Sequence, residues 1–273
     1  MDLSNENVIH IKKENIEYIQ FRKLLKYSDI LVHAFSVGKE VDFRTSKEEN
    51  YSNAIRDYEN LCKSLKIDKT NIIKPNQTHS DKIEIVNEKI NIKKPDINIE
   101  KYEKTDGLIT NKKNKILATT SADCILMLFF DPITKVIANV HSGWKGTYQE
   151  IAIKTIEKLE NKYNVNPKNL ICCMCPSIRK CHFEVKSDVK ELFYEKFKNL
   201  KEIKEIIEKI NSKEEKWKID TIKLNKILLR EKGLKEENII DSKICTVCNN
   251  EKLHSYRIEK EKYKLETAII SLK

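Results

Sequence analysis

Three side chains in the middle of the sequence are of types that bind transition metals. His79 and His141 offer neutral imidazole nitrogens, and Cys124 offers a thiolate. This donor set suits Zn²⁺, and three protein ligands leave the fourth tetrahedral position to water. Such a site is typical of catalysis, because the bound water becomes a hydroxide nucleophile near neutral pH. We therefore predict Zn²⁺ as the cofactor, with Cu²⁺ as the alternative metal.

The three predicted ligands stand in polar segments that interrupt apolar stretches. These segments are residues 76–80, 121–124 and 141–147. Each falls at a predicted strand end or turn, where α/β scaffolds present functional groups. Asp123 or Asp106 is the predicted carboxylate that orients an imidazole, and Asp123, Cys124 and His141 are the candidate catalytic residues. Spacing alone also allows a hydrogen-bonded His and a core Cys, because no short metal motif joins the segments.

The third polar segment contains a second candidate site, for an anion. Gly143 and Gly146 stand just before a predicted helix, together with Lys145 and Thr147. Small residues let backbone N–H groups approach an anion, and a helix N-terminus attracts negative charge. We therefore predict that phosphate binds these four residues beside the metal. A glycine-containing helix start without any ligand is the ordinary alternative.

The apolar pattern predicts the elements that position these side chains. The predicted strands are residues 30–35, 116–119, 125–130, 136–140, 170–174, 239–244 and 267–271, with a turn at 131–132. The predicted helices run from Ser46 to about residue 66 and over residues 147–162, 187–199 and 221–232. Short apolar runs of this kind are typical of buried central strands. The sequence therefore predicts an α/β (α+β) fold, a single layered domain with a central mixed β-sheet flanked by helices.

The composition favours one folded domain over residues 1–273. Forty per cent of the residues are hydrophobic, which is enough for a sizeable core, and no Gly/Ser-rich or Pro-rich linker divides the chain. The longest apolar run, residues 124–130, is far shorter than the roughly 18 residues that span a bilayer. The first residues are polar and do not form a signal peptide. We therefore expect a cytoplasmic protein without a membrane partner.

The net charge of +10 would suit a polyanionic partner. Nearly all of the basic residues are Lys, whereas the bidentate guanidinium of Arg is the usual reader of bases. The Lys residues are spread along the chain and interleaved with Glu, as in a global compositional bias. We therefore expect no nucleic-acid partner, and a non-enzymatic basic binding protein is kept as an alternative.

The eight cysteines predict thiols or metal ligands rather than disulfides, because the chain is long and carries no secretory signal. Two Cys-x-x-Cys pairs, Cys172 with Cys175 and Cys245 with Cys248, suggest a structural Cys₄ zinc site. However, Cys172 and Cys175 fall at a predicted strand end, without the turn residues of a zinc knuckle. That position favours ordinary thiols.

Several short motifs in order along the chain resemble those of one known family. They are residues 76–80 (NQTHS), 105–110 (TDGLIT), 121–124 (SADC), 138–147 (ANVHSGWKGT), 175–178 (CPSI), 181–185 (CHFEV), 245–246 (CT) and 255–257 (SYR). Together they resemble the laccase-domain polyphenol oxidase family, whose members are also described as peptidoglycan-editing factors and as purine nucleoside phosphorylases. The resemblance runs from about residue 30 to the C-terminus, and the ordered set is far more specific than any single motif.

The resemblance implies metal ligands at His79, Cys124 and His141. It also implies a zinc-dependent purine nucleoside phosphorylase for adenosine, inosine and methylthioadenosine, with adenosine deaminase activity. The expected partners are thus a small-molecule nucleoside and phosphate. On this hypothesis, hydroxide formed at the metal attacks the purine ring in deamination, and phosphate at residues 143–147 attacks the ribose carbon in phosphorolysis.

The chain departs from the family pattern near both ends. Gly38 is the single glycine where the family has a Gly-Gly-containing segment, and residues 265–267 replace a Thr-Gly-Arg pattern. His182 stands where the family usually has a second Cys. Arg44 is the candidate for a substrate-side Arg of the family. Arg257 either binds phosphate through its bidentate fork or forms a structural salt bridge.

Two other enzymatic functions are kept as alternatives. A copper-dependent polyphenol oxidase would fit a His/Cys site, although multicopper oxidation needs many more His than the six in the chain. A cytosolic peptidoglycan-precursor editing hydrolase would use Cys124 as the nucleophile and His141 as the base. The sequence leaves open the preferred substrate, the physiological metal and the oligomeric state.

Overall fold

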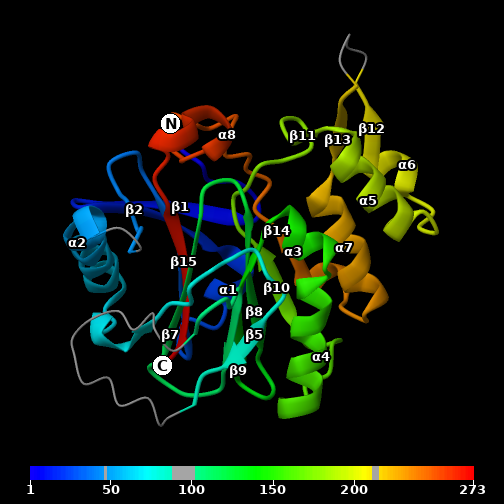
Figure 1. Cartoon of the computed structure of the whole chain (residues 1–273). Helices are drawn as coiled ribbons and strands as arrows, with labels where there is room; N and C mark the ends of the chain where they lie inside the picture. The colour runs from blue at the N-terminus through cyan, green and yellow to red at the C-terminus, as the bar shows by residue number, and fades with distance from the viewer. Residues whose placement is uncertain (46–47, 88–101, 211–214) are drawn as a thin grey trace.

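The computed structural model describes residues 1–45, 48–87, 102–210 and 215–273. In these residues the strands form two six-stranded sheets and one three-stranded sheet (Figure 1). The predicted α/β (α+β) class is confirmed, and each large sheet mixes parallel and antiparallel pairs. The prediction of one central sheet is corrected, because the strands divide between two sheets that share one core.

The first large sheet has the strand order β1-β2-β3-β15-β7-β4. Its strands are β1 (Val8–Lys13), β2 (Ile16–Phe21), β3 (Leu31–Val37), β15 (Glu266–Leu272), β7 (Ile116–Ser121) and β4 (Ile72–Ile73). Neighbours are antiparallel except for β4 and β7. Strands β1 and β2 were not predicted, and in this edge hairpin polar residues alternate with apolar ones.

The second large sheet has the strand order β14-β10-β8-β9-β6-β5. Its strands are β14 (Ile239–Asp241), β10 (Ile171–Met174), β8 (Ile125–Asp131), β9 (Val136–Ser142), β6 (Gly107–Thr110) and β5 (Ile83–Ile85). The outer pairs β10–β14 and β5–β6 are parallel, whereas the inner pairs are antiparallel. The three adjacent apolar runs are thus strands, but β7 lies in the first sheet and β8 and β9 lie in the second.

The two large sheets pack face to face, and helices cover their outer faces (Figure 1). Strand β8 shows why its run of apolar residues is continuous. Leu126 and Leu128 point into the core between the sheets, whereas Met127 and Phe129 pack beneath the helices. A strand buried on both faces needs apolar residues at every position, and this is the pattern that the sequence shows.

A buried amide joins the two sheets close to the predicted metal ligands. Asn139 of β9 donates from Nδ2 to the carbonyl oxygens of Leu117 (2.9 Å) and Ala268 (2.7 Å) in the first sheet. The hydroxyl of Thr119 donates to its Oδ1 at 2.5 Å. A buried polar side chain is favourable only when its donors and acceptors are paired. These bonds therefore fix the register between the sheets two residues before His141.

Helix α2 (Glu48–Leu65) covers the first sheet, and α4 (Ile151–Tyr163) with α7 (Thr221–Glu231) covers the second. The predicted cap Ser46 lies outside the described residues. The helix predicted over residues 147–162 is two helices, α3 (Trp144–Tyr148) and α4, because Glu150 between them adopts a left-handed φ of 59°. In the described residues, no helix is long and apolar enough to span a membrane.

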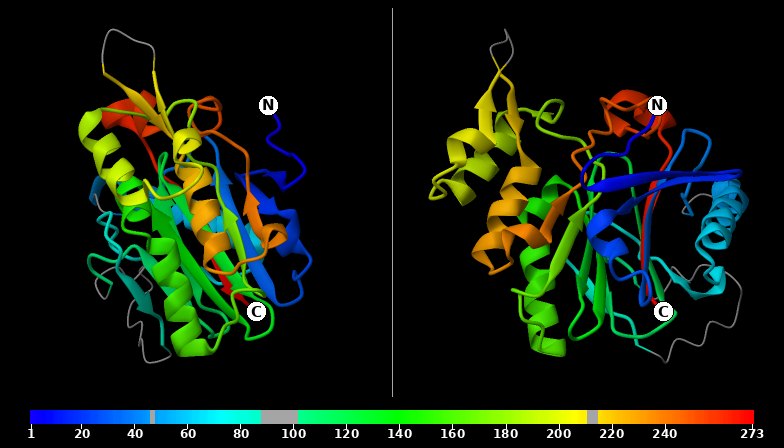
Figure 2. Two further views of the ribbon diagram at one scale, coloured as in Figure 1. Left: turned by 90° about the vertical axis from the view of Figure 1, so that its right-hand side faces the viewer. Right: turned by 180° about the vertical axis from the view of Figure 1, so that it is seen from behind.

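The smallest sheet projects beyond one end of the two large sheets (Figure 2). It consists of β11 (Glu184–Val185), β13 (Trp217–Ile219) and β12 (Ile207–Lys209), with α5 (Ser187–Phe197) and α6 (Ile203–Ile206) beside it. The remaining short elements are α1 (Arg22–Leu25), η1 (Lys69–Asn71), η2 (Glu236–Asn238), α8 (Tyr256–Glu259) and η3 (Lys260–Lys262). The predicted helix at residues 187–199 corresponds to α5, and its partner sheet was not predicted.

Candidate active site

The three predicted metal ligands come together although they are far apart in the sequence. His79 precedes β5, Cys124 lies in the turn between β7 and β8, and His141 lies near the end of β9. One ligand atom from each lies within 4.8 Å of the others. Sγ of Cys124 is 3.9 Å from Nε2 of His79, and the centres of the His79 and His141 rings are 4.9 Å apart. One ion fits between the three donors.

Asp106, at the start of β6, positions both imidazoles. Its Oδ1 lies 2.8 Å from Nδ1 of His141, which leaves Nε2 of that ring for a metal. The carboxylate also accepts the N–H groups of Thr78 (3.1 Å), His79 (3.1 Å) and Ser80 (2.7 Å). These bonds hold His79 at a left-handed φ of 60°, a strained conformation for a residue with a Cβ. The sequence named Asp106 as one of two candidates, and the structure selects it.

Gly143 lets the three ligands come close together. A Cβ at this position would lie 2.8 Å from Cδ2 of His79 and 3.0 Å from Sγ of Cys124. Its φ of −67° is open to any residue, so close approach rather than backbone conformation requires glycine here. The donor types, their separations and this space fit a tetrahedral zinc with one position left for water or substrate.

The charges in the cluster favour metal binding. Burial opposes ionisation of Cys124, but the neighbouring His141 and His79 lower the pKa of the thiol to about 6. Burial likewise opposes protonation of His141, whereas the Cys124 thiolate and Asp106 raise its pKa to about 9. Without a metal, the cluster is thus a thiolate beside an imidazolium. A divalent cation would replace the proton and meet the same negative charges.

Asp123 fixes the backbone turn in which Cys124 lies. It has a left-handed φ of 89°, and its carboxylate accepts hydrogen bonds from the hydroxyls of Thr246 (2.6 Å) and Ser255 (3.1 Å). It also accepts the backbone N–H of Arg257 at 2.8 Å. These three donors come from one segment near the C-terminus. They hold the turn before β8 against the opposite wall of the site.

The cluster opens into a cavity of about 950 Å³. Aromatic side chains in the wall include Trp144, Phe183, Tyr256 and Tyr263, and charged residues such as Glu184 also line it. Walls with mostly apolar rings and a few polar groups are typical of small-molecule sites. The volume is sufficient for a nucleoside together with a phosphate.

The four residues of the anion site predicted at residues 143–147 lie in different surroundings. Gly143 lines the cavity, Lys145 is exposed with its amino group 5.6 Å from the ring centre of Trp144, and Gly146 is buried. Thr147 is also buried, with its N–H donating to the carbonyl of Gly143 (2.8 Å) and its hydroxyl bonded to Ser142 (3.0 Å). Its N–H and its hydroxyl are thus both bonded within the protein, and its role in phosphate binding stays a prediction.

Arg257 lines the cavity, but its guanidinium is bonded to backbone. Nη1 donates to the carbonyl of His182 at 3.0 Å, and Nη2 donates to that of Glu184 at 3.1 Å. Neither of its predicted roles, a phosphate contact or a salt bridge, describes these bonds. Arg257 thus joins α8, in which it lies, to the chain between β10 and the start of β11, and so builds a wall of the cavity.

Two other cations face the cavity. Arg44 places its guanidinium 4.3 Å from the ring centre of Tyr263 and donates to that residue's carbonyl at 2.6 Å. Lys74 directly follows β4, and its amino group donates to the hydroxyl of Thr45 at 3.2 Å. Burial lowers the pKa of Lys74 to about 8, although Asp42 opposes this shift. The sequence gives no signal for Lys74, which is one lysine among many.

The Cys₄ zinc site suggested by the two Cys-x-x-Cys pairs does not form. Cys172 and Cys175 are fully buried in separate core clusters, on opposite sides of the second sheet. Alternation along β10 and the residue after it separates them. The other pair, Cys245 and Cys248, lies instead beside residues 181–182.

A buried ion pair anchors the segment that carries residues 181–182. Arg179 donates from both terminal nitrogens to Asp241 (2.7 and 2.8 Å), and Lys226 lies 3.1 Å from the same carboxylate. The backbone N–H of Lys243 also donates to it at 2.8 Å. Burial opposes ionisation of Asp241, but Arg179 and these neighbours lower its pKa to about 2.

We expect Asp241→Asn to lower the free energy of unfolding by about 3 kcal/mol near neutral pH, because Arg179 loses its partner. The pKa of Asp241 is lower in the folded chain than in the unfolded chain, where it is about 3.9. Ionised Asp241 therefore stabilises the fold above that pH, and this contribution is lost as pH falls towards 2. The deficit of the variant should therefore shrink over this interval in urea titrations. Asp29→Asn, at an exposed position, is the control. A deficit that stays constant would contradict the assignment.

The sequence of this chain is similar to those of known proteins. A family model described as multi-copper polyphenol oxidoreductase laccase matches residues 34–273. Purine nucleoside phosphorylase YlmD of Bacillus subtilis (strain 168) is 25% identical over 222 residues, covering 81% of this chain and 78% of that protein. Adenosine deaminase RL5, from an unknown prokaryotic organism, is 27% identical over 197 residues, covering 72% and 73%.

The fold is also similar to that of a solved structure. The crystal structure of the hypothetical protein YfiH from Bacillus licheniformis matches with a TM-score of 0.85. The match covers 97% of this chain and 99% of that one, at 22% sequence identity. At this identity the likeness shows the fold, and function must be argued from the site.

Proposed function

We propose a function from the premise that this chain belongs to the multi-copper polyphenol oxidoreductase laccase family. The chain is proposed to be a zinc-dependent purine nucleoside phosphorylase that also deaminates adenosine. Relatives that carry these two activities in their names support it. The observation that carries the proposal is the convergence of His79, Cys124 and His141 at a cavity of nucleoside size.

The donor set favours zinc over the copper chemistry in the family's description. Only His79 and His141, of the six His residues, belong to this cluster. His33 is buried and accepts the N–H of Phe21 at 2.7 Å, and His254 is bonded to the carbonyl of Val41 at 3.0 Å. His33 and His254 thus form hydrogen bonds within the protein, and the two His residues of the cluster are too few ligands for a multicopper centre. Bound zinc would supply Lewis acidity and a water of lowered pKa.

The cavity walls suggest how the substrates are held. The aromatic rings offer stacking surfaces for a purine, and Arg44 and Lys74 offer positive charge for phosphate. In phosphorolysis, a phosphate oxygen bonds to the anomeric carbon of ribose while the glycosidic bond breaks. The purine leaves with the bonding electrons and takes up a proton. In deamination, water adds to the ring carbon and ammonia leaves. Asp106 keeps His141 in one tautomer throughout both reactions.

Turnover of adenosine and inosine by metal-quantified protein tests the proposal. Free adenine or hypoxanthine should be released only when phosphate is present, with ribose 1-phosphate in equal amount. Inosine should form from adenosine without phosphate. Removing zinc with a chelator should stop both reactions, and added zinc should restore them. Stoichiometric zinc without any turnover would overturn the proposal, as would stoichiometric copper with phenol oxidation.

Lys74→Met is expected to raise KM for phosphate by about tenfold or more and to leave deamination nearly unchanged. The variant keeps the length of the side chain but removes the charge beside the cavity, and an ion-assisted hydrogen bond contributes about 1.5–3 kcal/mol. Initial rates at varied phosphate measure the effect. Lys162→Met, at an exposed position of α4, is the matched control. An equal loss in both reactions would show that Lys74 does not serve phosphate.

One observation favours a second function, hydrolysis of a peptidoglycan precursor. Cys124 lies beside two imidazoles, 3.9 Å from Nε2 of His79, and a thiol next to a His is a usual covalent nucleophile. Metal dependence separates the two functions. If Cys124 is a nucleophile, alkylation of its thiol should stop the reaction and removal of metal by a chelator should not. If Cys124 is a metal ligand, both treatments should stop the reaction.

A further inference from the structure

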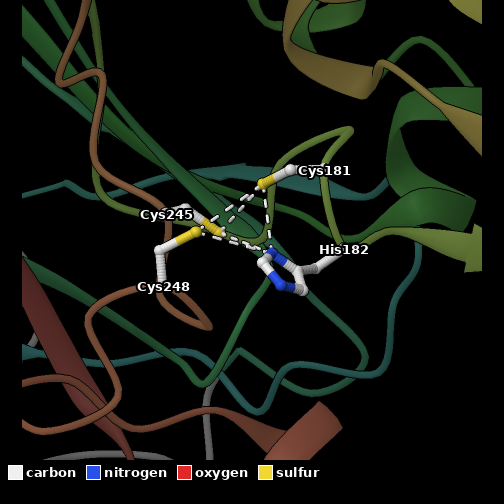
Figure 3. Close-up of side chains that lie close together, drawn as sticks. All are labelled: Cys181, His182, Cys245 and Cys248. Atoms are coloured by element: carbon white, nitrogen blue, oxygen red, sulfur yellow. Dashed lines mark hydrogen bonds between the residues drawn. The ribbon is translucent and has the colours of Figure 1, made fainter.

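A second group of metal-binding side chains lies outside the candidate active site. Its members are Cys181, His182, Cys245 and Cys248, and one ligand atom from each lies within 4.8 Å of the others (Figure 3). Figure 3 shows the three sulfur atoms and one imidazole nitrogen facing a common centre. Two of the ligands follow β10 and two follow β14, more than 60 positions apart in sequence. We propose that this cluster is a structural zinc site.

The separations of the donor atoms match a tetrahedron around zinc. With Zn–S near 2.3 Å and Zn–N near 2.0 Å, a tetrahedron places sulfurs about 3.8 Å apart and sulfur about 3.5 Å from nitrogen. Sγ of Cys181 lies 3.6 Å from that of Cys245 and 3.9 Å from that of Cys248. Nδ1 of His182 lies 3.7 Å from Cys245, 3.5 Å from Cys248 and 3.1 Å from Cys181.

The sulfur separations do not describe a disulfide. A disulfide joins two sulfurs at about 2.05 Å, and all eight cysteines are free thiols here. Four protein ligands also differ from the three of the active site. A closed set of three thiolates and one imidazole leaves no position for a substrate, which is the pattern of a structural zinc. This inference does not depend on the proposed enzymatic function.

The backbone around the cluster is held in place by the protein itself. Cys245 is buried, and its carbonyl accepts both the N–H (3.1 Å) and the side-chain amide (2.8 Å) of Asn249. This turn brings Cys248 back beside it. On the other side, the N–H of His182 donates to the carbonyl of Arg179 at 2.9 Å. A site whose ligands are already placed loses little conformational entropy on binding metal.

A metal here would join two segments that both line the cavity. Phe183 and Glu184 follow the first two ligands, and Arg257 follows the second two. The hydroxyl of Thr246, next to Cys245, donates to Asp123 of the active-site turn. The zinc would therefore hold the two segments of this wall to each other. Its role is to position the wall rather than to contact substrate.

The test is the zinc content of full-length protein purified with reductant and without chelator. We expect about two zinc ions per wild-type chain and about one in Cys124→Ala. Adding Cys248→Ser to Cys124→Ala should remove the remaining ion and lower Tm by at least about 5 °C. His182→Cys keeps a metal ligand at this position and should retain the zinc, whereas His182→Ala should lose it. Cobalt in the Cys124→Ala protein should show thiolate-to-metal charge-transfer bands.

Any of three results would overturn the site. The first is a Cys124→Ala protein with reduced thiols that is free of zinc and unchanged by added zinc. The second is a zinc content that is the same with and without Cys248→Ser. The third is a disulfide between Cys181 and either partner cysteine, found by mass spectrometry in protein prepared without reductant or chelator. Cys62→Ala, at a buried thiol of α2, is the control for general effects of cysteine loss. Wild-type protein alone decides the stoichiometry if the variants fail to fold.

Discussion

Replacing Cys124 with alanine is expected to remove one zinc ion per chain and to lower kcat/KM for adenosine by at least about 1000-fold. A ligand that is lost outright should cost more than the 10- to 100-fold that is typical of losing a residue that only orients a ligand. The two remaining His donors would hold a divalent cation weakly, and the thiolate that balances its charge would be absent. Metal analysis and steady-state rates on the same preparation measure both effects.

The control for this variant is Cys62→Ala, which removes a buried thiol from α2. It should lose at most about 1 kcal/mol of stability and keep both the metal and the activity. If Cys124→Ala retains its full metal content, the ligand assignment is wrong. If it loses the metal but still phosphorolyses adenosine, the metal does not serve catalysis. Loss of activity in wild-type protein after chelation, restored by zinc, excludes a role for Cys124 as nucleophile alone.

Asp106→Asn is expected to weaken zinc binding at the active site by at least about 100-fold while the fold persists. The carboxylate accepts the N–H groups of Thr78, His79 and Ser80 and also pairs with His141. An asparagine would present an NH₂ group to one of these donors and would remove the charge that favours the ring orientation. Both imidazoles would thus lose their support through one substitution.

Competition with chelators of graded affinity measures this change, and circular dichroism confirms the fold. The matched control is Asp220→Asn at the start of α7, where the side chain accepts the N–H of Lys223 at 2.8 Å. Asparagine caps helices as well as aspartate does, so this variant should bind zinc normally. Wild-type zinc affinity in Asp106→Asn would mean that the ligands are positioned by the sheet alone.

Side-chain types and local patterns were enough to predict part of this protein. The apolar residues 125–130 predicted a buried strand, because only a strand covered on both faces needs apolar residues at each position. The donor types at residues 79, 124 and 141 predicted zinc, because ligand chemistry belongs to the residue itself. The order of the motifs indicated the family, which the match over residues 34–273 shows.

Local patterns did not predict which segments meet. The run at β7 looks like those of β8 and β9, yet it pairs with β15 in the other sheet. The helix predicted at residues 147–162 is interrupted at Glu150, where the left-handed backbone separates α4 from α3, whose first residue Trp144 lines the cavity. Strand pairing and helix breaks depend on contacts between distant residues, and a single sequence carries little information on these.

The composition of both groups of potential metal ligands was likewise decided by the tertiary structure. Alternation along β10 puts Cys172 and Cys175 into separate cores, and Cys245 meets Cys181 only because β14 pairs with β10. Lys74 reaches the cavity because the short strand β4 ends beside it. The sequence by itself determined which donors the chain has to offer. The pairing and packing of its strands decided which of them share a site, because that proximity arises only when the sheets form.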